Sequence, residues 1–125
     1  MAMTWYPSVE DVIDTNILTL DLTRDHHPHR LLRSRDAIQS VIERVRDIEN
    51  RGLSYQAAQL MRDLAKLHAF AGANHRTAYI VAKMFLRRNG KRLRVDRLED
   101  AYAFIKDLEN KTVEQIQGWI EYGEA

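Results

Sequence analysis

The sequence has no cysteine and no long apolar run, and each absence excludes a class of protein. Without cysteine the chain cannot form disulfides. No apolar stretch approaches the roughly 18 residues that a membrane-spanning helix needs. The first residues, M-A-M-T-W-Y-P, also lack the basic start, apolar middle and cleavage site of a secretory signal. We therefore expect a soluble, cytoplasmic protein with no membrane partner.

Length and composition predict one domain. The chain has 125 residues, of which 45% are hydrophobic and 30% charged, and this balance is typical of globular rather than disordered proteins. That length can bury one core but is too short for two comfortable domains. The sequence contains no internal repeat, heptad run, glycine-rich phosphate loop or low-complexity segment. We expect a single domain over residues 1–125.

Helix caps and apolar spacing predict an all-α bundle of about six helices. The first helix is expected near residues 9–19, followed by a loop to Arg33. The second should end at Asn50-Arg51-Gly52, and the fourth, expected to be central, at Asn89-Gly90. The fifth should continue to Asn110. The expected side-chain caps are Ser8 with Asp11, Ser34, Asp96 with Glu99, and Thr112 with Gln115.

The end of the third predicted helix is the most informative stretch. His68 continues an apolar stripe, so it is expected on the buried side of a helix, where a lone histidine is usually a core residue. The loop 71–74 that follows consists of small residues, and Arg76 then falls in the first turn of the next helix. A cation is disfavoured there unless an anion is nearby. The backbone amides of such a loop and helix start can bind phosphate.

These residues resemble the core motif of the Fic/Doc family, H-x-F-x-[DE]-[GA]-N-[GK]-R. The matching residues are His68, Phe70, Ala73, Asn74 and Arg76. The continuation T-A…F-L-R-R-N-G is most similar to the death-on-curing (Doc) branch. In that family a histidine takes a proton from a target hydroxyl, which attacks a bound nucleotide; Fic members usually transfer AMP and Doc proteins the terminal phosphate.

The resemblance assigns roles by position. It implies that His68 is the catalytic base and that ATP or another nucleoside triphosphate is the cofactor. Phe70 is expected to anchor the loop by burying its ring. Phosphate or nucleotide contacts are implied for Gly72, Ala73, Asn74, His75 and Arg76. For the partners, it implies an antitoxin-like inhibitor and a protein substrate such as a translation factor.

Two positions differ from the family motif. Gly72 stands where the family has the acid that ligates Mg²⁺, so the usual protein ligand of that metal is missing and no residue is predicted to bind a metal. Asp63 is a candidate to replace it. His75 stands where Doc proteins have lysine. Two functions stay open: a Doc-like toxin that transfers a phosphate or nucleotidyl group, and a degenerate module that binds nucleotide or a partner protein without turnover.

Three further features have alternative interpretations. Relatives carry a flap where residues 46–54 lie, so a short β-hairpin is an option there. Residues 83–97 hold seven basic residues against Asp96 alone. This cluster is more often a solvated face than a contact for an acidic partner, and no interleaved aromatics support nucleic-acid binding. His26, His27 and His29 could bind a metal, although a solvated loop is the preferred interpretation.

Overall fold

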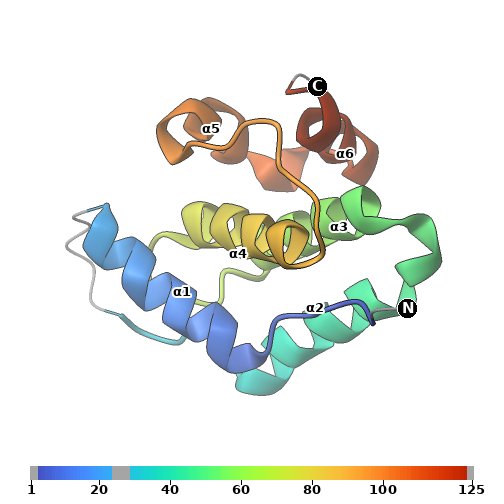
Figure 1. The fold of residues 1–125 in the computed structure, drawn as a ribbon. Coiled ribbons are helices and arrows are strands. Elements are labelled where there is room, and N and C mark those ends of the chain that lie inside the picture. The colour runs from blue at the N-terminus through green and yellow to red at the C-terminus, as the bar shows by residue number, and fades with distance from the viewer. Residues whose placement is uncertain (1–2, 24–28, 124–125) are drawn as a thin grey trace.

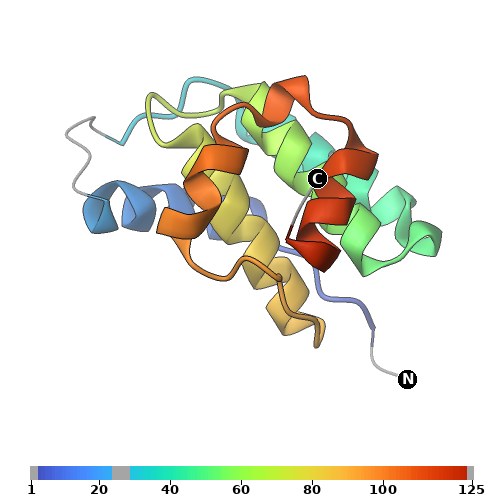
Figure 2. The ribbon, with the colours of Figure 1, turned by 90° about the horizontal axis from the view of Figure 1, so that it is seen from above.

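The computed structural model describes residues 3–23 and 29–123, which form an all-α bundle in three layers (Figure 1). In chain order the elements are α1 (Val9–Leu22), α2 (Arg35–Asp47), the short 3-10 helix η1 (Glu49–Arg51), α3 (Leu53–Leu67), α4 (Asn74–Arg88), α5 (Leu98–Ile105), the 3-10 helix η2 (Leu108–Asn110) and α6 (Val113–Tyr122). α3 and α4 form the middle layer, with α1 and α2 on one side and α5 and α6 on the other. Seen from above, α5 crosses α4 while α6 lies over α3 (Figure 2).

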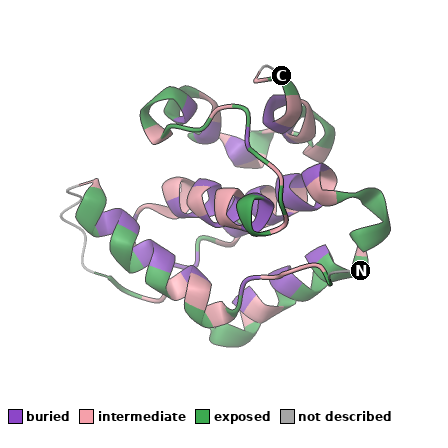
Figure 3. Ribbon diagram, in the orientation of Figure 1, coloured by how far each residue is buried: buried purple, intermediate pink, exposed green. Residues whose placement is uncertain are grey.

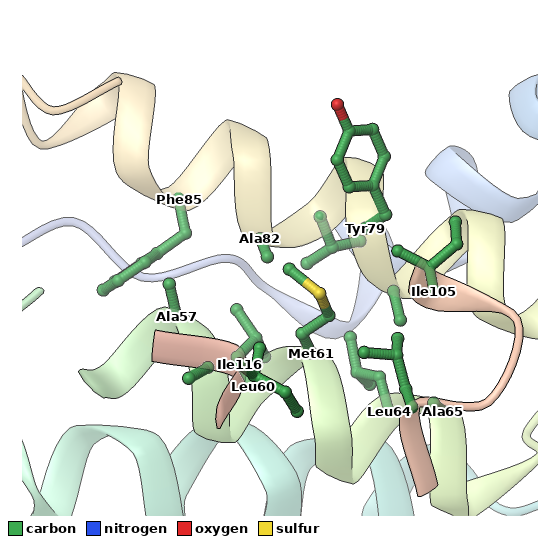
Figure 4. Close-up of a cluster of buried hydrophobic side chains, with 14 of the residues drawn as sticks. Ala57, Leu60, Met61, Leu64, Ala65, Tyr79, Ala82, Phe85, Ile105 and Ile116 are labelled. Atoms are coloured by element: carbon green, nitrogen blue, oxygen red, sulfur yellow. The ribbon is translucent and has the colours of Figure 1, made fainter. Parts of the chain in front are cut away.

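The core lies where α3 and α4 meet the two outer layers, and burial is concentrated there (Figure 3). Alanines on both helices are fully buried, which lets the two backbones approach closely. Larger side chains fill the remaining space: Met61 of α3 lies beside α4, and Ile105 and Ile116 reach in from the outer layer (Figure 4). The prediction that α4 is central is confirmed.

Three of the predicted side-chain caps are present. Ser8 and Asp11 bond each other's backbone amides in a capping box, and Thr112 and Gln115 do the same at the start of α6. Ser34 accepts a hydrogen bond from the amide of Ala37 at 3.1 Å. Each cap satisfies an amide that has no partner within its helix, so these boundaries follow from local sequence.

The fourth predicted cap is wrong. Asp96 does not cap α5, whose first residue follows Arg97 without a side-chain cap. Its carboxylate instead lies 3.0 Å from Nζ of Lys83 and 3.8 Å from Nη2 of Arg87, both on α4. α5 also ends at Ile105 rather than continuing to Asn110, and η2 follows it after a short turn.

The short β-hairpin that was an option for residues 46–54 is not formed. This segment consists of the end of α2, η1 and the start of α3, with Gly52 at φ 92° between them. Strand-like pairing occurs elsewhere in the described residues, as one isolated antiparallel bridge between Leu31 and Phe70.

No helix in the described part of the chain is long and apolar enough to cross a membrane.

Candidate active site

The loop between α3 and α4 has a residue in the left-handed backbone conformation at each of its ends. His68 ends α3 in the left-handed conformation (φ 48°, ψ 53°), and Ala73 precedes α4 in the same region (φ 58°, ψ 30°). Among the described residues these are the non-glycine positions with positive φ. Such a conformation costs a side-chain-bearing residue about 1–2 kcal/mol. The surrounding structure must therefore hold this loop in place.

The left-handed turn also changes where His68 lies. Its side chain is 54% exposed, so the prediction that it belongs to the buried stripe of α3 is wrong. The stripe depends on helical spacing, which ends at Leu67. Beyond that residue the positive φ redirects the chain, and the imidazole leaves the core for the surface.

Phe70 is a buried residue of the loop. It is 3% exposed and belongs to the core. The amide of Phe70 donates to Oδ1 of Asn74 at 3.0 Å, and Nδ2 of Asn74 donates back to the Phe70 carbonyl at 2.8 Å. On the other side, the amide of Leu32 donates to the Ala69 carbonyl and that of Ala71 to the Arg30 carbonyl. The side chain of Asn74 is thus occupied in shaping the loop.

Asn16 of α1 joins three segments around the loop, a role that the sequence analysis did not predict. It is fully buried. Its Nδ2 donates to the Gly72 carbonyl at 3.0 Å and to Oγ1 of Thr77 at 3.1 Å. Its Oδ1 lies 3.0 Å from Nδ1 of His29, which must donate because the amide oxygen only accepts. His29 therefore has a structural partner; His26 and His27 lie outside the described residues.

Glu109 of η2 contacts both His68 and His75. Nε2 of His75 donates to its carboxylate, 2.9 Å from each oxygen, and Nε2 of His68 lies 3.6 Å from Oε2. Partial burial acts to raise the pKa of Glu109, but the hydrogen bond from His75, a backbone hydrogen bond and the charges of both histidines lower it below its ordinary value of 4.5.

Arg76, in the first turn of α4, contacts the end of α1. Its Nη1 donates to Oγ1 of Thr23 at 2.7 Å. Arg76 also lines a cavity that His68 and His75 line.

Most residues of the motif line one cavity of about 320 Å³, whereas Phe70 and Gly72 do not. Its lining residues are His68, Ala71, Ala73, Asn74, His75, Arg76, Tyr102 and Lys106. The last two come from α5 and its C-cap, and no local signal in the sequence connects them with the motif. A larger groove of about 430 Å³ lies between α1 and α4, away from the loop. We place the site in the smaller cavity because it holds the exposed imidazole and the start of α4.

The residues around this cavity do not fit a protein-held Mg²⁺. Gly72 offers no side chain, and its carbonyl already accepts from Asn16. Asp63 does not line the cavity: Gln59 donates to its Oδ1, and its Oδ2 lies 3.4 Å from Nη2 of Arg44. Glu109 is hydrogen-bonded to the imidazole of His75. An imidazole is a ligand that suits transition metals better than magnesium. The described residues contain no group of three or more histidines and acids placed to hold a metal ion.

A family model decides which proteins this chain resembles. The Fic/DOC family model matches residues 6–86, more than half of the chain. The chain belongs to the Fic/DOC family. No curated protein matches the chain significantly. The match to the Fic/DOC model covers α1 to α3, the loop and most of α4. Tyr102, Lys106 and Glu109 lie beyond the matched residues.

Several basic residues of the cluster at residues 83–97 contact other side chains of the same molecule. Lys83 and Arg87 pair with Asp96, and Arg97 pairs with Glu99. The guanidinium of Arg88 lies 4.9 Å from the centre of the Trp5 ring. These contacts give several of the cations structural partners, which favours the interpretation as a solvated face.

Proposed function

We propose that this protein binds a nucleoside triphosphate at the 72–76 loop and transfers a phosphate or nucleotidyl group to a protein hydroxyl. The observation that carries the proposal is the position of His68. Its half-exposed imidazole lines the same cavity as the loop and the start of α4, in a chain that belongs to a family whose members generally transfer such groups to proteins. A base and a phosphate-binding helix start are the two parts this chemistry requires.

In the proposed reaction, His68 accepts the proton of the target hydroxyl and the hydroxyl oxygen attacks phosphorus. Attack at the terminal phosphorus breaks its bond to the bridging oxygen and releases a nucleoside diphosphate. Attack at the first phosphorus releases pyrophosphate and leaves the nucleotide on the target. Backbone amides at the start of α4, together with Arg76, face the charge that builds on the phosphate. No step is assigned to a protein-held metal.

The Doc-like form of this proposal makes the protein a toxin. Its target would be a translation factor, and a separate antitoxin-like protein would restrain it. The support is the resemblance of the motif and its continuation to the Doc branch. Growth arrest on expression of the wild type, absent for His68→Ala at equal protein level, is the expected result. Equal growth with both would contradict the toxin role.

A second function is favoured by specific contacts. Gly72 has no metal-binding side chain, and the carboxylate of Glu109 occupies His75, at the position where Doc proteins have a free lysine. Both features favour a degenerate module that binds nucleotide or a partner protein without turnover. Family membership alone does not decide between the two functions, because one scaffold can support both.

One experiment separates these functions. Lysate proteins are incubated with the protein and with ATP labelled at either the first or the terminal phosphate, and labelled proteins are identified by mass spectrometry. Wild type should label a discrete target, and His68→Ala should reduce labelling by about 100-fold or more. Labelling that is equal for the two proteins, or absent with both labels, would contradict the transferase.

Gly72→Asp is the informative gain-of-function variant. Among the described glycines, positive φ occurs at Gly52, Gly90 and Gly123, so the backbone at Gly72 is one an aspartate can adopt. If a missing metal ligand weakens the transferase, this variant should increase Mg²⁺-dependent labelling. Its fold must be checked by circular dichroism, because Gly72 is buried. A folded, nucleotide-binding variant that stays inert would favour the degenerate module.

A further inference from the structure

α5 brings an aromatic ring and a cation to the cavity from outside the part of the chain that the family model matches. Tyr102 is on α5 and Lys106 is its C-cap, one turn later, so the two lie on the same side of the helix. Both line the cavity together with residues of the loop. Neither belongs to the motif.

Lys106 differs from the other basic side chains of the cavity in its partners. His75 donates to Glu109, and Arg76 donates to Thr23. The acid next to Lys106 in sequence, Asp107, is bonded by Lys111 at 2.8 Å. Within the described residues no carboxylate lies within ion-pair distance of the ammonium of Lys106. The pKa of Asp107 is lowered mainly by the hydrogen bond from Lys111 and less by the nearby charge of Lys106. A polyphosphate entering the cavity therefore meets this cation without displacing an existing ion pair.

Tyr102 adds a different kind of contact. Its side chain is 52% exposed although it lines a cavity, so much of the ring is available to a ligand. A ring of this kind can stack on a nucleobase whatever the base, because every base has an aromatic face. The cavity volume of about 320 Å³ also lies in the range of small-molecule sites.

We propose that Tyr102 and Lys106 complete a nucleoside-triphosphate site, in which Lys106 binds the phosphates and Tyr102 stacks on the base. This inference rests on the proposed nucleotide binding and extends it to two residues outside the motif. Lys106 then supplies, from another helix, a charge that His75 cannot offer while Glu109 holds it. The base contact makes the ligand a nucleotide rather than any polyphosphate.

The test is calorimetric titration of the full chain with ATP, AMP and inorganic triphosphate. Tyr102→Ala should weaken ATP binding about 5- to 100-fold and leave inorganic triphosphate unchanged, since only ATP has a base. Lys106→Ala should weaken ATP and inorganic triphosphate about tenfold, AMP less, and Lys106→Arg should restore most of the loss. The matched controls are Tyr122→Ala, an exposed tyrosine on α6, and Lys91→Ala, beyond the far end of α4. Both should bind as wild type does.

The outcomes separate this inference from the proposed function. If Arg76→Ala weakens ATP binding while Tyr102→Ala and Lys106→Ala bind as wild type does, the site stands without α5 and this inference is overturned. If wild type binds neither ATP nor inorganic triphosphate, both proposals fail. If the variants behave as expected but no protein target is labelled, the inference holds and the transferase does not.

Discussion

Both carboxylate oxygens of Glu109 lie 2.9 Å from Nε2 of His75, although 34 positions separate the two residues in the sequence. The contact ties η2 to the first turn of α4. It also ties the last part of the chain to the motif, because Nε2 of His68 lies 3.6 Å from the same carboxylate. The pair therefore has consequences for stability that can be measured without any substrate.

We predict that Glu109 makes the protein more sensitive to acid. Its folded pKa is below the ordinary value of 4.5, so its ionised form stabilises the fold above that pH, and this contribution is lost as the pH falls through the folded pKa. Urea unfolding between about pH 6 and pH 3.5 measures it. Glu109→Gln should lose less stability than wild type over that range. Glu43→Gln, an exposed acid on α2, should lose as much as wild type; matching curves for all three proteins would refute the assignment.

Replacing Asn16 should destabilise the fold, because its side-chain amide is buried and both its nitrogen and its oxygen are hydrogen-bonded. Asn16→Leu removes the partners of the Gly72 carbonyl, the Thr77 hydroxyl and the His29 imidazole. We expect the free energy of unfolding to fall by about 2–3 kcal/mol. Asn50→Leu, at an exposed position in η1, should change it by less than about 0.5 kcal/mol. Equal effects of the two substitutions in urea denaturation would show that Asn16 has no special role.

Asn74→Ala should loosen the loop locally. The substitution removes both hydrogen bonds to the backbone of Phe70, at a cost of about 1–3 kcal/mol. Hydrogen exchange of the Phe70 amide should become faster. Asn89 offers a matched control, because its amide bonds the backbone of Trp5 in the same two-way manner, at the other end of α4. Asn89→Ala should therefore destabilise the protein without a selective increase in hydrogen exchange at the Phe70 amide. Unchanged exchange at Phe70 in Asn74→Ala would argue against the proposed role of Asn74.

Ala73→Gly should be neutral or stabilising, which is unusual for a glycine substitution. Ala73 has φ 58°, a region that glycine enters without the steric cost of a Cβ. Glycine increases the conformational entropy of the unfolded chain, which destabilises the fold, but the relief of the steric cost offsets this loss. We expect the free energy of unfolding to rise by about 0 to 1 kcal/mol. Ala103→Gly, on the exposed side of α5, should instead lose about 1 kcal/mol. Thermal unfolding of both variants is the check, and similar losses would count against strain at Ala73.

Features that depend on neighbours three or four positions away were predictable from the sequence. The caps at Ser8, Ser34 and Thr112 and the end of α4 before Asn89-Gly90 are of this kind. The burial of Phe70 followed from a large ring placed in a loop of small residues. For the caps and the end of α4, the deciding contact lies within one or two turns, so the local sequence contains the whole interaction.

Features that depend on distant contacts or on backbone reversals were not predictable. His68 left the buried side because a positive φ ends the helical spacing. Asp96 has the spacing of a cap, but two cations on α4 compete for its carboxylate. Glu109 reaches His75 only because η2 lies against α3 and positions it there, and no periodicity encodes that placement.

The cavity is built from two parts of the chain that are made at different times. Synthesis proceeds from the N-terminus, and the first part to emerge contains α1 to α4 with the whole motif. The wall formed by α5 and the carboxylate of Glu109 emerge after the motif. A nascent or truncated chain that stops after α4 would thus carry a complete motif without a complete cavity. The cavity is therefore complete only after α5 and η2 have also been synthesised.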